Sequence, residues 1–202
     1  MCFDHNVKTI IMLCKLEENG KEKCVKYWEP NISDSVMDYL NYSVKYTSEE
    51  INDDITIRTC HVLNEDTKVE KEIKQIHYGG WPDHETPENI QNVYGNILFM
   101  FNFVDNLIGQ NHIDDKNPIV VENPIVVHCS AGVGRTGTFI ALYNIYREIL
   151  HQLSDNKIKQ ISFSLMNIVR KLKEMRLYMV QTLEQYKFIY TFINRLLQNK
   201  NI

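Results

Sequence analysis

The passage from an apolar run into a glycine-rich turn, at residues 124–137, constrains the fold of this chain more than any other feature. The sequence there reads PIVVHCSAGVGRTG, so Val126 and Val127 lead directly into a stretch that contains Gly132 and Gly134, and a helical pattern follows. In sheets covered by helices, a strand commonly delivers such a loop to the sheet edge, and a helix comes next. We therefore expect a buried strand, then a loop, then a helix packed on the sheet.

The strand sequence occurs twice in a row. Residues 117–122 read NPIVVE and residues 123–128 read NPIVVH. Only the second copy continues into a cysteine, two glycines and an arginine. We interpret the first copy as a local duplication in a loop and the second copy as the buried strand.

Hydrophobic periodicity divides the rest of the chain into strands followed by helices. Strand patterns occupy residues 7–13, 23–28, 54–60 and, more weakly, 68–78, with an Asn19-Gly20 hairpin turn between the first two. Helical patterns begin after Pro87 and recur at residues 136–152, 161–172 and 182–197. This order predicts an α/β (α+β) protein in which helices pack on a sheet. No linker interrupts the chain, so residues 1–202 are expected to form one domain.

Composition excludes several classes of function. The chain has 22 Lys and Arg residues against 26 Asp and Glu residues, without a basic block, which gives no support for binding nucleic acid. No apolar run reaches the length of a membrane span, and the first residues lack the order of a signal peptide. The five cysteines include no Cys-x-x-Cys pair, which argues against disulfides and a zinc site and favours a reducing, cytoplasmic setting.

The loop after residue 128 has the chemistry of an anion cradle with a nucleophile inside it. Gly132 and Gly134 allow the backbone to curl so that successive N–H groups point inward, and the following helix adds the positive end of its dipole. The pKa of Cys129 should therefore fall well below the usual value of about 8.5, because the surrounding groups favour the thiolate. Arg135 adds a planar fork that can hold two oxygens of a phosphate. A thiolate beneath a phosphate-shaped nest predicts covalent phosphoryl transfer.

Residues 128–136, HCSAGVGRT, resemble the signature loop of the protein tyrosine phosphatases. The resemblance implies that Cys129 is the nucleophile. It implies that the phosphate is bound by the side chain of Arg135 and by the backbone of Ser130, Ala131, Gly132, Val133 and Gly134. It also implies that His128 helps to set the loop and the cysteine pKa, and that Thr136 offers its hydroxyl to the sulfur.

A second segment, HYGGWPDHETP at residues 77–87, contains a candidate acid. Taken alone, Asp83 in this turn-rich stretch reads as a solvated aspartate. Beside the cysteine loop, the segment resembles the mobile general-acid loop of the same family. The resemblance implies that Asp83 contacts the substrate, protonates the leaving group and later accepts a proton from water. Trp81 would then be an apolar hinge contact of this loop.

A third segment, MVQTLEQY at residues 179–186, contains two glutamines four positions apart. The spacing puts Gln181 and Gln185 on one face of a helix, which by itself indicates little. The segment resembles the family motif whose two glutamines position the attacking water, with Gln181 also at the substrate.

A fourth segment, ENGKEKCVKYW at residues 18–28, resembles a hairpin of the same family. The resemblance implies that Glu18 orients the signature arginine and that Lys23 contacts the acid loop. Tyr27 would pack near His128. Taken alone, exposed Glu and Lys side chains on a hairpin are usually just solvated.

The motifs together predict a protein-tyrosine phosphatase that acts on phosphotyrosine-containing proteins in the cytoplasm and needs no metal or other cofactor. The resemblance covers about residues 1–200 and implies a central, mixed, twisted sheet flanked by helices. It begins partway into the family's domain, and the basic, tyrosine-containing loop that walls the family's pocket has no copy here. We therefore expect an N-terminally truncated domain, or a divergent member with a shallower pocket.

Two other functions remain open at this point. A phosphotyrosine-binding pseudophosphatase would keep the cradle but turn over poorly, and binding without turnover would identify it. A dual-specificity or lipid phosphatase would tolerate a shallow pocket, although the WPD segment and the paired glutamines together are typical of the tyrosine-specific branch. Comparing the rates on phosphotyrosine and phosphoserine peptides separates these functions from a tyrosine-specific phosphatase.

Overall fold

The computed structural model describes residues 1–28, 37–81, 90–108, 124–154 and 160–199. Its strands are β1 (Thr9–Met12), β2 (Glu17–Glu18), β3 (Lys21–Glu22), β4 (Met37–Tyr39), β5 (Tyr42–Asn52), β6 (Ile55–Asn64), β7 (Glu70–Tyr78) and β8 (Ile125–His128). Its helices are α1 (Ile90–Ile108), α2 (Gly134–Ser154), α3 (Leu165–Met175) and α4 (Leu183–Asn199).

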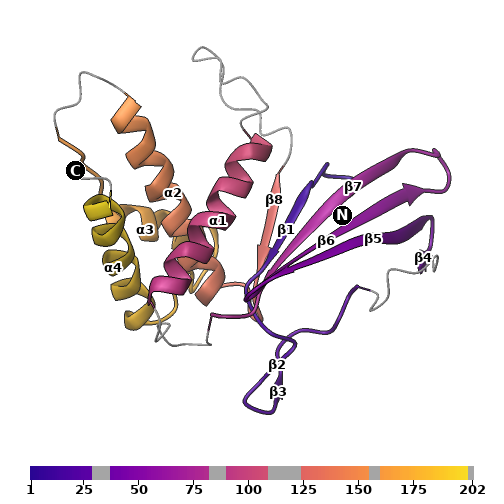
Figure 1. The fold of residues 1–202 in the computed structure, drawn as a ribbon, viewed down its shortest axis with the longest axis horizontal. Helices are drawn as coiled ribbons and strands as arrows, with labels where there is room; N and C mark the ends of the chain where they lie inside the picture. Colours follow the sequence, from indigo (N-terminus) through magenta and orange to yellow (C-terminus); the bar gives the residue numbers. More distant parts are fainter. Residues whose placement is uncertain (29–36, 82–89, 109–123, 155–159, 200–202) are drawn as a thin grey trace.

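The described strands form a mixed sheet in the order β4-β5-β6-β7-β1-β8, and β2 and β3 form a separate hairpin. Neighbours from β4 to β7 are antiparallel, whereas β7, β1 and β8 are parallel. The four helices gather beside the β8 end of the sheet, and the β5–β6 end extends away from them (Figure 1). The predicted α+β architecture of a mixed sheet with helices is confirmed.

Strand β8 leads into the cysteine loop and pairs with β1, with Met12 opposite His128. The Leu13 N–H donates to the His128 carbonyl at 2.8 Å. β8 comes from the second NPIVV copy, as predicted, and the first copy lies outside the described residues. The prediction that this strand is buried was wrong. All four β8 residues are partly exposed, because β8 has a neighbour on one side only among the described strands.

The hairpin predicted at Asn19-Gly20 is present but shorter than the pattern indicated. Asn19 and Gly20 both have positive φ, 53° and 70°, which an Asn-Gly hairpin turn requires. β2 and β3 have two residues each, and residues 23–28 are not the strand that we predicted. The N–H of Lys23 donates instead to the Leu16 carbonyl at 2.7 Å, which closes the hairpin and ends its ladder.

Strand β5 was missed by the sequence patterns. Its sequence, YSVKYTSEEIN, carries mostly polar and charged side chains, and its second half is largely exposed. A register shift between Tyr46 and Ser48 also breaks its alternation. Backbone pairing with β6 along almost its full length stabilises this strand. Such pairing does not require a hydrophobic pattern in the sequence.

Phe101 of α1 lies at the centre of the helical core. Its ring centroid is 5.3 Å from that of Phe139 in α2 and 6.1 Å from that of Phe192 in α4. These aromatic contacts fix α2 against its neighbours. Because α2 begins at Gly134, the same packing fixes the direction in which the cysteine loop leaves the sheet.

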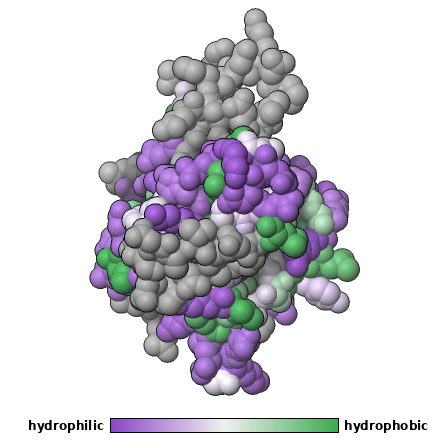
Figure 2. Space-filling view, turned by 90° about the vertical axis from the view of Figure 1, so that its right-hand side faces the viewer, coloured by the Kyte–Doolittle hydropathy of each residue, from purple (hydrophilic) through white to green (hydrophobic). Residues whose placement is uncertain are grey.

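The described surface at the sheet end is mainly polar. Viewed from the sheet end of the molecule, hydrophilic side chains cover most of the surface that is described, and hydrophobic residues occur as separate spots (Figure 2). None of the helices in the described ranges combines the length and the apolar character that crossing a bilayer requires.

Candidate active site

The residues after β8 form a tight loop that ends in α2. Gly132 has a φ of 69°, in the left-handed region where a side chain would be strained. The Gly137 N–H donates to the Val133 carbonyl at 3.0 Å, which closes the first helical turn onto the loop. Cys129 is 6% exposed and lies between the end of β8 and this turn. The loop therefore surrounds the thiol with backbone N–H groups and the positive end of a helix.

Cys129 is the one thiol with a lowered pKa among the five cysteines, all of which the structure describes. Burial raises its pKa. The Thr136 hydroxyl, which donates to the sulfur at 3.2 Å, the backbone N–H groups of Thr136 and Gly132, and the charge of Arg135 together outweigh burial. In the four others burial is the largest cause and raises the pKa, to about 12 in Cys14 and about 11 in Cys60, and no lowering contribution outweighs it. The loop thus favours the thiolate of Cys129 alone.

Thr136→Val is expected to raise the pKa of Cys129, because valine resembles threonine in shape but cannot donate to the sulfur. The rate of alkylation of Cys129 by iodoacetamide, followed against pH, locates this pKa. At pH 6 the rate should fall several-fold in Thr136→Val. Thr136→Ser keeps a hydroxyl and serves as the control. An unchanged pH profile in Thr136→Val would contradict the role of this hydrogen bond.

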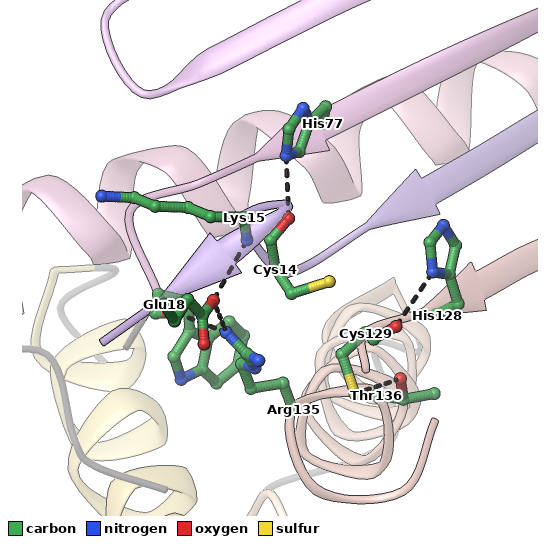
Figure 3. A network of polar contacts seen from close by, with 9 residues as sticks. Cys14, Lys15, Glu18, His77, His128, Cys129, Arg135 and Thr136 are labelled. Carbon is green, nitrogen blue, oxygen red and sulfur yellow. Dashed lines mark hydrogen bonds and ion pairs between the residues drawn. The ribbon is translucent and has the colours of Figure 1, made fainter. Parts of the chain in front are cut away.

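Arg135 is buried, at 1% exposure, and is held from two sides. Its Nη1 donates to Glu18 Oε1 at 2.6 Å and to the Trp81 carbonyl at 2.9 Å. Glu18 also accepts a hydrogen bond from the Lys15 N–H at 3.0 Å (Figure 3). Because Glu18 belongs to β2, the short hairpin fixes the direction of the guanidinium group next to Cys129. The arrangement places a rigid, planar cation at the cradle.

His128 connects the cradle to the segment that follows the hairpin. Its Nε2 lies 2.7 Å from the Tyr27 hydroxyl, and its Nδ1 lies 3.1 Å from the Cys129 carbonyl oxygen. With its proton on Nδ1, His128 donates to that carbonyl and accepts from Tyr27. Burial raises the pKa of Tyr27 to about 12, so the phenol stays neutral and can donate. This chain of contacts holds the backbone at Cys129.

Gln181 and Gln185 lie beside the first residue of α2. A methyl group on Gly134 would lie 2.9 Å from Gln185 Nε2 and 3.2 Å from Gln181 Oε1. Gln185 Oε1 accepts from the N–H groups of Gln181 at 2.9 Å and of Thr182 at 3.3 Å. Thr182 Oγ1 accepts in return from the Gln185 N–H at 3.1 Å. Thr182 and Gln185 therefore form a capping box at the start of α4, a structural role that the sequence motif did not reveal.

Residues 176–181 contact the cradle at points that the sequence analysis missed. Arg176 Nη2 donates to the Ala131 carbonyl at 3.2 Å, and the Val180 N–H donates to the Val133 carbonyl at 3.1 Å. Arg176 directly follows the amphipathic helix α3. A basic residue directly after an amphipathic helix is usually part of its solvated face, so no sequence pattern indicated this contact.

Gly137→Ala is expected to destabilise the protein. The added methyl group would lie 2.5 Å from the backbone nitrogen of Val180, and no side-chain rotation can relieve that contact. We expect urea denaturation to show a loss of about 1–3 kcal/mol in the free energy of unfolding, the usual cost of overpacking. Gly95→Ala in α1, where a methyl group meets nothing within 4 Å, is the control and should stabilise by up to about 1 kcal/mol. Equal stabilities of the two variants would contradict the close approach.

The predicted acid, Asp83, lies outside the described residues, and so does the predicted contact between Lys23 and the acid loop. Trp81, the last residue of the acid segment that the structure describes, is buried against Phe188, with ring centroids 5.5 Å apart. Within the described ranges, no group of three or more His, Cys, Asp or Glu residues is arranged to hold a metal ion. Around one cradle the structure brings together Glu18, Tyr27, Trp81, His128, Cys129, Arg135, Thr136, Gln181 and Gln185.

Comparison with known proteins gives the family. Residues 1–195 match the sequence model of the protein-tyrosine phosphatases. The chain belongs to this family. Human receptor-type tyrosine-protein phosphatase eta is 35% identical over 189 residues, which are 94% of this chain and 12% of that protein. Mouse tyrosine-protein phosphatase non-receptor type 20 is 30% identical over 199 residues, which are 98% of this chain and 41% of that protein.

The phosphatase fold is also shared with solved structures. The catalytic domain of human protein tyrosine phosphatase non-receptor type 18 matches with a TM-score of 0.77 and 29% identity, over 96% of this chain and 62% of that chain. The mixed sheet with its helices is therefore a protein-tyrosine phosphatase fold, as the signature loop predicted. The chain spans less than half the length of the two relatives above and less than two thirds of this solved domain.

Proposed function

We propose that this chain is a cysteine-dependent protein-tyrosine phosphatase that hydrolyses phosphotyrosine in proteins through a cysteinyl-phosphate intermediate. The observation that carries the proposal is the loop geometry, in which the Thr136 hydroxyl donates to the Cys129 sulfur at 3.2 Å and Arg135 is held in place by Glu18. These groups also favour a lowered pKa of Cys129. Its partners would be phosphotyrosine-containing proteins in the cytoplasm. In support, the non-receptor type 18 relative has a solved structure in complex with HER2 phosphopeptides. Residues 1–202 would act as one catalytic domain.

In the first step the Cys129 thiolate attacks phosphorus, and the bond from phosphorus to the tyrosine oxygen breaks. Arg135 and the N–H groups of the loop hold the other phosphate oxygens as negative charge develops. Asp83 donates a proton to the leaving phenolate, so tyrosine leaves neutral. The fixed direction of the Arg135 fork, set by Glu18, reduces the reorganisation that this step needs.

In the second step water attacks phosphorus, and the phosphorus–sulfur bond breaks with its electron pair on Cys129. The water proton passes to the Asp83 carboxylate, which restores the acid for the next cycle. Gln181 and Gln185 would position the water, since both amides lie beside the cradle. Thr136 stabilises the departing thiolate through its hydroxyl. No metal takes part in either step.

Asp83→Ala is expected to lower kcat for a phosphotyrosine peptide on the order of 10²-fold, the usual contribution of a general acid. The loss should be smaller for p-nitrophenyl phosphate, because nitrophenolate leaves readily without a proton. Steady-state kinetics on both substrates give this comparison, and Glu50→Ala, which removes an exposed acid on β5, is the control. Equal losses on the two substrates would contradict the role of Asp83 as the acid.

The experiment that tests the function is a phosphatase assay of the 202-residue chain in the presence of EDTA, with phosphotyrosine and phosphoserine peptides side by side. Fast release of phosphate from phosphotyrosine alone supports the proposal. Similar rates on both peptides would favour a dual-specificity enzyme instead. Binding of the phosphotyrosine peptide without release of phosphate would identify a binding module.

A further inference from the structure

Val180, the residue before Gln181, has an unusual backbone conformation. Its φ is 57°, in the left-handed region that β-branched residues avoid, and its side chain is buried. Tyr178, two residues earlier, also has a positive φ, of 67°. Such strain persists only where the surrounding structure holds it, and it is concentrated at functional sites.

Three described hydrogen bonds hold the two peptide units around Val180. The Val180 N–H donates to the Val133 carbonyl at 3.1 Å, and the Val180 carbonyl accepts from the Lys173 ammonium at 3.2 Å. The Gln181 N–H donates to Gln185 Oε1 at 2.9 Å. The last two bonds act on opposite ends of one peptide unit, the unit between Val180 and Gln181. Its rotation would break both bonds.

Lys173 lies in the last turn of α3, where a lysine is ordinarily explained by the negative end of the helix dipole. Its ammonium, however, reaches beyond its own helix to a carbonyl seven residues later. The bond is charge-assisted, which makes it stronger than a bond between neutral groups. Lys173 is therefore tied to the peptide unit from which the Gln181 side chain begins.

We propose that Lys173 is a positioning residue for the breakdown of the cysteinyl-phosphate, and that it acts through the Val180–Gln181 peptide unit. The proposal rests on the proposed function above. In this step the water oxygen bonds to phosphorus, the sulfur–phosphorus bond breaks with its electrons on Cys129, and the water proton passes to Asp83. Gln181 aims the water, and a small misplacement of an aiming group lowers the rate. Lys173 fixes that aim without touching the water.

The effect should be confined to the second step. Formation of the intermediate depends on Cys129 and Arg135, whose described side-chain contacts run to Thr136, Glu18 and Trp81. Lys173→Met should therefore leave the rate of formation close to that of the parent. It should slow breakdown roughly fivefold, which corresponds to the net contribution of one partly exposed hydrogen bond. A purely structural role for Lys173 would instead affect both steps together.

The test compares the parent chain with Lys173→Met, Lys173→Arg and Lys171→Met. Rapid-quench experiments with a radiolabelled phosphotyrosine peptide give the rates of formation and breakdown of the intermediate, which is trapped by denaturation. Lys173→Arg keeps a cationic donor and should restore breakdown. Lys171→Met removes the same charge from an exposed position on the same helix and should behave like the parent.

A double variant shows whether Lys173 acts through Gln181. Gln181→Ala should slow breakdown by itself, and adding Lys173→Met should slow it no further, because the aimed group is already gone. The role of Lys173 is overturned if Lys173→Met breaks down at the parent rate, if Lys171→Met slows breakdown equally, or if the two losses add. Absence of any trapped intermediate in the parent chain would overturn the proposed function, and this role with it.

Discussion

Cys129→Ser should reduce the hydrolysis of aryl phosphates to background, a loss on the order of 10⁴-fold or more, as for other nucleophiles that form covalent intermediates. The donors that lower the pKa of the thiol, chiefly Thr136 and the loop N–H groups, cannot ionise a serine hydroxyl at neutral pH, because its pKa is far higher than that of a thiol. Initial rates with p-nitrophenyl phosphate measure this loss. Serine fits where cysteine did, so the cradle should still bind a phosphotyrosine peptide.

Cys60→Ser is the matched control for this result. Cys60 lies on β6, where its thiol donates to the Ile73 carbonyl at 3.5 Å, and serine can make the same bond. The control should keep full activity. Hydrolysis by Cys129→Ser at the rate of the parent would exclude the Cys129 thiolate as the nucleophile and would mean that another group attacks phosphorus. Titration calorimetry with the peptide shows whether the inactive variant keeps its cradle.

Arg135→Lys should lower kcat/KM on the order of 10³-fold, although it keeps the positive charge. Arg135 presents a planar fork that the contacts with Glu18 and Trp81 hold in place, and a lysine ammonium is a point charge that cannot bind two phosphate oxygens side by side. The change also leaves the partly buried Glu18 carboxylate with a poorer partner, so some loss of stability should accompany the loss of rate.

Stability and activity must be separated for this variant. Urea denaturation gives the folded fraction, and kcat/KM is then expressed per folded molecule. Arg147→Lys in α2 is the control, because Arg147 pairs with Asp105 at 2.8 Å and makes no described contact with the cradle. A loss per folded molecule below about tenfold would show that charge alone is sufficient at position 135, against the bidentate geometry expected of arginine.

The sequence predicted the parts of this protein whose chemistry is local. The cysteine loop needs a strand, two glycines, an arginine and a helix start within about twenty residues, and all of these are adjacent in the chain. Helices α1, α2 and α4 show a hydrophobic face at helical spacing, so their positions could also be predicted from the sequence. The family resemblance then added Glu18, which lies 117 residues from Arg135 and which no local pattern connects to it.

Contacts that depend on the packing of distant segments could not be read in this way. Lys173 and Arg176 look like the polar side of an amphipathic helix, and only the folded chain shows that both reach carbonyl groups outside it. The partial exposure of β8 depends on which strands flank it, and hydropathy does not encode that. β5 is held mainly by backbone pairing, to which the side chains contribute little pattern.

The capping box at the start of α4 has a consequence for how such sequences are compared. Gln185 caps the first turn of α4 and lies beside the cradle at the same time, so under the proposed function two selective pressures would act on one side chain. A related chain without phosphatase activity would still gain helix stability from this glutamine. If related sequences retained this glutamine, the retention would therefore indicate selection for the stability of α4 as much as for catalysis. Loss of Cys129 in a related sequence would indicate a change in the chemistry of the site only.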